Sequence, residues 1–185
     1  MRWDDLFADL EAQAYAAGIA QRAGEVDERT RGEVGTLGVH ERLRGALDAP
    51  LRLRLAGGLT LAATLRRVGP DWLLLDEGGG REAVVVLAAV LGVRGLGRHS
   101  TTPDTGGVVE SRLGLRHAVR GIARDRLPCR LHLADASTLD ATIDRVGADF
   151  VEVATHGAGE PRRRQDVREV ELLPFTALVA VRRTL

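Results

Sequence analysis

The chain contains two copies of one segment, and this repeat constrains its fold more than any other feature. The segment 51–76 aligns without a gap on the segment 129–154 at an offset of 78 residues, and twelve of the 26 aligned positions are identical. A repeat of this length indicates a duplicated folding unit, so each copy tests the structure that is predicted for the other. A chain of 185 residues has room for two such small units.

The composition limits what the chain can bind. Apolar residues make up 44% of the chain and aromatic residues 3%, which favours tightly packed cores of Leu, Val and Ala over a roomy ligand cavity. The 26 basic and 26 acidic residues cancel, which argues against a general polyanion binder but leaves a local cationic patch open. The sequence indicates no bound small-molecule substrate and no cofactor.

The cysteine and histidine content argues against a metal site. Cys129 is the only cysteine, so the chain has no internal disulfide, and its alignment with Leu51 predicts a small core residue. The five histidines are scattered without ligand spacing, and we therefore expect no zinc site. No apolar run reaches the roughly 18 residues that a membrane helix needs, and no leader pattern is visible, so we expect a soluble, cytoplasmic protein without a membrane partner.

Each copy reads as a short helix followed by strands. Residues 37–47 match residues 113–123 at an offset of 76, and both segments are short amphipathic helices. Leucines at alternate positions then predict a half-buried first strand, with Leu51, Leu53 and Leu55 in one copy and Cys129, Leu131 and Leu133 in the other. A long second strand, a third strand and a final strand follow in each copy. They lie at 59–68, 72–75 and 84–94 in the first copy, and at 137–146, 150–153 and 172–182 in the second.

The N-terminal segment lies outside the repeat. Residues 1–34 lack Pro, and Trp3, Phe7 and Leu10 fall on one stripe of a predicted amphipathic helix. The stripe either packs on a barrel of its own chain or docks a second copy or another protein as a partner helix. We therefore predict a helix over 1–34, a first unit over 35–96, a linker over 97–111 and a second unit over 112–185.

The order of elements resembles a known fold family. A helix and five short strands, with a long second strand and a Gly-x-Asp-aromatic turn before the third, resemble the Sm/LSm fold, which is a helix followed by a small open barrel of the SH3-like class. The segment 53–75, LRLAGGLTLAATLRRVGPDWLLL, is similar to the strand-turn-strand core of the bacterial Sm-like RNA chaperone Hfq. The resemblance implies a mainly β fold of two tandem Sm-like barrels, preceded by the long N-terminal helix.

The resemblance predicts the fold, but the residues through which the family contacts RNA are absent from this sequence. The small residue that Sm proteins usually keep as Gly in the second strand is Ala63 in one copy and Ala141 in the other. The chain also lacks the Tyr-Lys-His sequence near the last strand, the Asn after the second strand and the Arg-Gly pair of the last hairpin. Because core spacing reports fold, the family resemblance leaves the function to be argued from surface residues.

The best basic cluster lies on a loop that only the second copy has. Arg162, Arg163, Arg164 and Arg168 are the candidate nucleic-acid-binding residues, where guanidinium groups would clamp phosphates. Acidic neighbours at 160, 166 and 169 favour a self-compensated, solvated loop over this reading. Trp72 and Phe150 are either base-stacking platforms or core residues, and their equivalent placement favours the core.

No catalytic residue stands out. Asp71 and Asp149 occupy equivalent positions, which suits turn residues better than a catalytic pair, and no nucleophile has a base beside it. We therefore expect a non-catalytic interaction or regulatory module, bound to a protein partner or to itself through edge strands and hairpins. The alternative is an RNA-binding regulator that uses the Arg-rich loop and the groove between the barrels; an enzyme with a site between the barrels has the least support.

Overall fold

Alternating apolar residues place one face of each strand in a core. In β1 (Pro50–Leu55), for example, Leu51, Leu53 and Leu55 are buried while the residues between them are exposed. The computed structural model describes residues 35, 37–97, 113–157 and 169–183. The described residues from Val39 onward belong to one compact unit, and the predicted helix over 1–34 lies outside the described residues.

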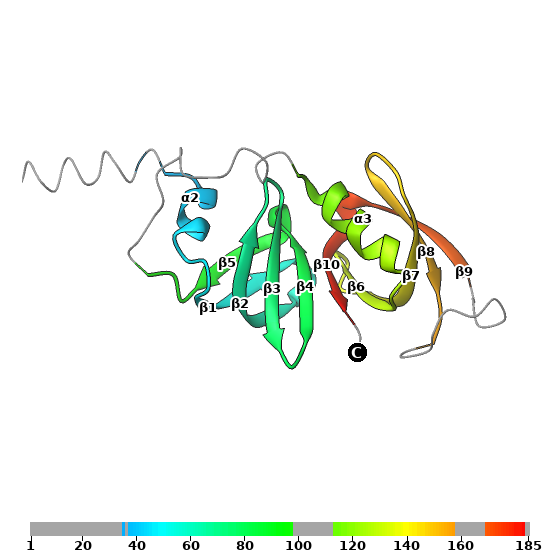
Figure 1. The fold of residues 1–185 in the computed structure, drawn as a ribbon, viewed down its shortest axis with the longest axis horizontal. Coiled ribbons are helices and arrows are strands. Elements are labelled where there is room, and N and C mark those ends of the chain that lie inside the picture. Colours follow the sequence, from blue (N-terminus) through cyan, green and yellow to red (C-terminus); the bar gives the residue numbers. More distant parts are fainter. Residues whose placement is uncertain (1–34, 36, 98–112, 158–168, 184–185) are drawn as a thin grey trace, which may run out of the picture. The chain divides into compact units, whose positions relative to one another are not determined.

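The described chain is mainly β, as predicted, with few helices (Figure 1). Its strands form a single ten-stranded antiparallel sheet in the order β5-β1-β2-β3-β4-β10-β6-β7-β8-β9. We call residues 39–97 the first half and residues 113–183 the second half. The first half contains α2 (Val39–Arg44), β1, β2 (Thr60–Val68), β3 (Trp72–Gly78), β4 (Arg81–Val86) and β5 (Val90–Arg94). The second half contains α3 (Leu115–Asp125), β6 (Cys129–Leu133), β7 (Thr138–Val146), β8 (Phe150–Thr155), β9 (Glu169–Pro174) and β10 (Leu178–Arg183).

Strand pairing within the two halves follows the same register. Leu51 pairs with Ala63 between β1 and β2, and Cys129 pairs with Ala141 between β6 and β7, which are the same positions at the sequence offset of 78. The second strand of each half also has an irregularity at one equivalent place, between Leu65 and Arg67 in β2 and between Ile143 and Arg145 in β7. Register is specified where one face is buried, so equal apolar patterns give equal pairings.

The halves meet where β10 pairs with β4. Figure 1 shows β10 (red) between β6 of its own half and β4 of the first half, and in this register Val181 lies opposite Val84 and Arg182 opposite Ala83. The Arg182 guanidinium also forms a paired ion contact with both carboxylate oxygens of Glu77 at the end of β3. We call this set of contacts the internal junction.

A glycine is required at the internal junction. Gly57 has a φ of +64°, and a Cβ built there would lie 2.6 Å from the backbone oxygen of Leu133. A side chain is therefore excluded both by the left-handed backbone and by the close approach of the second half.

Helix α3 begins against the first half. The backbone N–H of Leu115 donates to Asp71 Oδ1 at 2.6 Å, and the indole N–H of Trp72 donates to the backbone oxygen of Leu113 at 2.7 Å. Gly114, which precedes the helix, supplies no side-chain cap, so the Asp71 carboxylate satisfies one of the free N–H groups of the first turn. Asp71 thus does more than the turn role predicted for it: its backbone oxygen accepts from the N–H of Leu87 in the 3-10 turn before β5, while its side chain caps a helix of the other half.

Removal of the Asp71 carboxylate should therefore destabilise the chain more than the equivalent change in the second half. We expect Asp71→Ala to lower the free energy of unfolding by about 1 kcal/mol, the usual value for a lost helix cap. Asp149→Ala is the matched control, because the Asp149 backbone oxygen accepts from Phe175 as Asp71 does from Leu87, while no hydrogen bond of its carboxylate is present among the described residues. Urea denaturation in dilute solution measures both, and equal losses would contradict the capping role.

Candidate functional site

The residues that the sequence singled out for binding lie outside the described residues. This holds for the partner-helix stripe of Trp3, Phe7 and Leu10, and for the basic loop residues Arg162, Arg163, Arg164 and Arg168. Both sites therefore stay predictions, and the candidate surfaces described below come from other residues.

The first candidate surface consists of the two outermost strands of the sheet, β5 and β9. In the described part of the chain, β5 pairs only with β1 and β9 only with β8, so each strand leaves one backbone edge unpaired. These edges carry large apolar side chains in solvent: Leu91 on β5 is 58% exposed, and Val170 and Leu172 on β9 are 61% and 54% exposed. An edge with exposed apolar residues is a template for pairing with another strand.

The second candidate surface is a cluster of three arginines on β1 and β5, which we call the arginine cluster. Arg52 and Arg94 are direct register partners, and Arg54 lies opposite Gly92 with its guanidinium 3.5 Å from the backbone oxygen of Leu91. Among the described residues none of the three forms an ion pair. Like charges directly opposite each other destabilise a strand pair, so an anion bound between them would be favourable.

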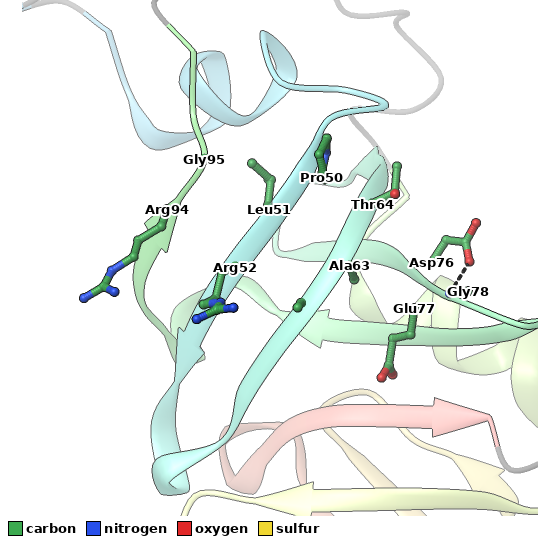
Figure 2. A pocket seen from close by; sticks show the side chains of 11 residues that line it. Pro50, Leu51, Arg52, Ala63, Thr64, Asp76, Glu77, Gly78, Arg94 and Gly95 are labelled. Atoms are coloured by element: carbon green, nitrogen blue, oxygen red, sulfur yellow. Dashed lines mark hydrogen bonds between the residues drawn. The ribbon is translucent and has the colours of Figure 1, made fainter.

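Two hollows adjoin the arginine cluster. One, of about 400 Å³, is lined by the three arginines together with Thr60, Gly92 and Val93. The other is a groove of about 670 Å³ (Figure 2), where Arg52 and Arg94 lie on one side and Asp76 and Glu77 on the other.

The carboxylates of this groove are already engaged. Asp76 accepts from the Arg66 guanidinium at 2.9 Å and from the backbone N–H of Gly78, and these contacts, with the guanidinium first, lower the pKa of Asp76. Glu77 is held by Arg182. A carboxylate with a lowered pKa is a weak base, so Asp76 is poorly suited to accept a proton from a substrate.

The second half neutralises the arginines that correspond to the cluster. Arg130, the equivalent of Arg52, forms a bidentate pair with Asp140, where the first half has Ala62. Arg182, the equivalent of Arg94, is paired with Glu77. His132 replaces Arg54, and burial first and the charges of Arg182 and Arg130 next lower its pKa, which favours a neutral ring. At these three equivalent positions, therefore, only the first half presents arginines without an ion pair among the described residues.

Cys129 is a core residue, as predicted. Its side chain is 2% exposed, and its Sγ donates to the backbone oxygen of Ala141 at 3.3 Å. Burial, and to a lesser extent the charge of Asp140, raises the pKa of the thiol from 9.0 to about 12. The thiolate is the reactive form of cysteine, so Cys129 is unsuited to nucleophilic chemistry.

We therefore expect Cys129 to react with an aromatic disulfide reagent only after unfolding. Native protein should show almost no reaction. Protein unfolded in guanidinium should release one equivalent of the reagent's aromatic thiolate per chain, because the chain has one cysteine. The raised pKa also predicts that stability falls as the pH rises from 9.0 toward 12, since the unfolded chain loses the thiol proton in that range and the folded chain keeps it. Fast labelling of the native protein would contradict both expectations.

Neither metal-binding clusters nor related proteins identify the site. Among residues 35, 37–97, 113–157 and 169–183, no group of three His, Cys, Asp or Glu side chains could hold a metal ion, and no helix in these ranges has the length and apolar character to cross a membrane. Comparison with protein-family models, with curated proteins and with solved structures gives no match.

Proposed function

We propose that this chain is a non-catalytic interaction or regulatory module in which two Sm-like barrels accept partner strands at β5 and β9. One observation carries the proposal: within the described residues both outermost strands of the sheet have an unpaired edge, and Leu91, Val170 and Leu172 on them are more than half exposed. Proteins normally shield such edges with charge, proline or a covering element. Although β9 has two glutamates and a proline and β5 has an arginine, the exposed apolar residues between them are suited to a partner that adds a strand and buries them.

The barrel assignment is supported by the strand order within each half. In the first half, β5 pairs with β1, and β1 to β4 follow one another as hairpins; β10, β6, β7, β8 and β9 repeat that order. A helix precedes the strands in both halves, and a short 3-10 turn precedes the last strand in both, at Leu87–Ala89 and at Phe175–Ala177. This order agrees with the helix and five strands of the Sm-like resemblance.

Co-purification from the native cell tests the interaction function. The tagged chain is purified with nuclease, in parallel with Leu91→Lys and Leu172→Lys, which place a charge on each edge. We expect the wild-type chain to retain bound protein and the edge variants to lose it, because a charged edge residue opposes pairing with another strand. Leu47→Lys is the control, since Leu47 is 46% exposed but lies outside the edge strands. Retention of the same protein by the edge variants would overturn the proposal.

An RNA-binding regulator is the second candidate, and the arginine cluster is the observation that favours it. Arg52, Arg54 and Arg94 would hold phosphates next to the groove of Figure 2, and the loop with Arg162, Arg163, Arg164 and Arg168 would add further contacts. Arginine is well matched to phosphate because its planar guanidinium offers two parallel donors.

Salt dependence separates this candidate from the first. Binding of a labelled single-stranded RNA should weaken linearly on a logarithmic salt scale, with a slope of about 0.7 for each phosphate contact. Replacing Arg52, Arg54 and Arg94 together with Gln should reduce that slope, while Arg120→Gln on the exposed side of α3 should leave it unchanged. Absence of binding at low salt, or an unchanged slope in the triple variant, would exclude the arginine cluster as an RNA site.

A further inference from the structure

We infer that the strand partner is a second copy of this chain, whose β9 pairs with β5 in the register of the internal junction. The inference rests on the proposed function, since it names the occupant of the edges assigned there. Its basis is an equivalence between strands. β10 pairs with β4 inside the chain, and their equivalents, β5 and β9, each have an unpaired edge among the described residues. Residues 178–182 of β10 have their equivalents in β5, and each position of β4 has its equivalent in β9, at an offset of 88 residues.

Apolar residues of β4 and β10 are buried in the chain, whereas the equivalent residues of β9 and β5 are exposed. Val84 on β4 is 7% exposed, whereas its equivalent Leu172 on β9 is 54% exposed. Val179 on β10 is 1% exposed, whereas its equivalent Leu91 on β5 is 58% exposed. Burying both leucines in a repeated junction would remove this apolar surface from water, which favours association.

The start of the first helix shows the same contrast. Leu115 in the first turn of α3 is 4% exposed because α3 begins against the first half, whereas its equivalent Val39 at the start of α2 is 61% exposed. In a repeated junction the N–H of Val39 would face the carboxylate of Asp149, as the N–H of Leu115 faces that of Asp71. Asp149 is exposed, and its turn has the same backbone hydrogen bond as the turn of Asp71.

Charges in the inferred register are complementary. Shifting the β4–β10 pairing by 88 residues places Leu172 opposite Val93, and Glu171 opposite Arg94. Arg94 has no ion pair among the described residues, so the Glu171 carboxylate of another copy would supply the missing counter-charge. A symmetric pairing of β5 with β5 would instead bring two arginine clusters together, which like-charge repulsion opposes.

Two contacts of the internal junction do not repeat. Thr155 stands at the equivalent position of Glu77, so Arg94 depends on Glu171 for its counter-charge. The position of Gly57 is taken by Asp135, which has a side chain and no positive φ, so the close approach of Gly57 to the Leu133 backbone oxygen cannot repeat between copies. The inferred contact is therefore made by the strands and by the first helical turn.

The contact is head-to-tail, because different surfaces of the two copies meet. Each added copy then leaves one free β5 and one free β9, and growth continues until the ends meet in a ring or a filament forms. Assemblies larger than a dimer are therefore expected, whereas a symmetric contact would stop at two copies.

Sedimentation velocity of the purified chain over a wide concentration range tests the inference. The wild-type chain should form concentration-dependent assemblies larger than a dimer. Arg94→Glu and Glu171→Arg should each weaken assembly by roughly tenfold, because each places like charges opposite each other. An equal mixture of these two variants should regain wild-type assembly, since every β5–β9 contact between unlike copies then joins opposite charges.

Three controls keep the result interpretable. Far-ultraviolet circular dichroism checks that both charge variants fold, and Arg120→Glu on the exposed side of α3 should assemble like the wild type. Asp149→Ala should fold normally and assemble less, because it removes only the inferred cap of the next copy. A monomer at all concentrations, a dimer only, or a mixture that fails to regain assembly would overturn the inference.

These outcomes are distinguishable from failure of the proposed function. A monomeric chain that still binds another protein through Leu91 and Leu172 would exclude self-assembly and preserve the interaction module. If the Leu91→Lys and Leu172→Lys variants keep every bound protein and every assembly, both the self-assembly and the proposed interaction function are excluded.

Discussion

Leu53→Ala is expected to lower the free energy of unfolding by about 2–5 kcal/mol, the range for removing a fully buried leucine side chain. Leu53 is 0% exposed and lies at the centre of β1, opposite Leu61 on β2 and Val93 on β5. Truncation there leaves a cavity between three strands that the fixed sheet register prevents from collapsing. Because small domains are stable by only about 5–15 kcal/mol, the loss is a large part of the total.

Leu131→Ala is the matched variant in the second half. Leu131 is also 0% exposed, and it lies opposite Leu139 on β7 and Val181 on β10. Since β4 and β10 join both halves in one sheet, we expect both variants to shift the same single urea transition without changing its slope. Two separate transitions, each moved by one variant only, would show that the internal junction does not couple the halves.

Glu77→Gln is expected to cost about 2–3 kcal/mol of unfolding free energy. The Glu77 side chain is 10% exposed and that of Arg182 28%, so the pair is largely removed from water at the internal junction. Loss of one partner leaves a guanidinium without its counter-charge, which typically costs 3–5 kcal/mol in a fully buried pair and less here because Arg182 keeps some solvent. Glu152→Gln is the control: its partner Arg145 is 79% exposed, and pairs of that kind contribute about 0–1 kcal/mol.

A double variant separates the ion pair from simple packing. Glu77→Leu with Arg182→Leu removes both charges, so it should lose less stability than either single change. Urea denaturation of the three variants gives the coupling free energy. Additive losses would mean that Glu77 and Arg182 stabilise the junction independently of each other.

Much of the local structure was predictable from the sequence. The alternation of Leu51, Leu53 and Leu55 defines β1, and the repeat transfers the same pattern to β6. Helices α2 and α3 lie within the predicted segments, apart from the last two residues of α3, and the third strands begin at the predicted aromatic residues Trp72 and Phe150. These features depend on periodicity and turn chemistry, which are local properties of the chain.

The pairing of β4 with β10 was not predictable in the same way. Ala83, Val84 and Val85 suit burial against any apolar strand, and nothing local states which strand supplies the partner edge. The arginine cluster was missed for a related reason. Arg52 and Arg94 are far apart in sequence, and their lack of an ion pair within the described residues becomes informative only by comparison with Arg130 and Arg182, which are paired. The predicted helix stripe and basic loop lie outside the described residues.

Joining both halves in one polypeptide allows their surfaces to evolve separately. In the second half the position of Ala62 is taken by Asp140, which forms an ion pair with Arg130, whereas Arg52 has no ion pair among the described residues. A protein built from identical separate subunits would acquire such a substitution in every subunit at once. The tandem order instead fixes one half with an Arg52 that has no ion pair among the described residues for each half with a paired Arg130, so a larger array of this chain would repeat that unpaired arginine at every second half.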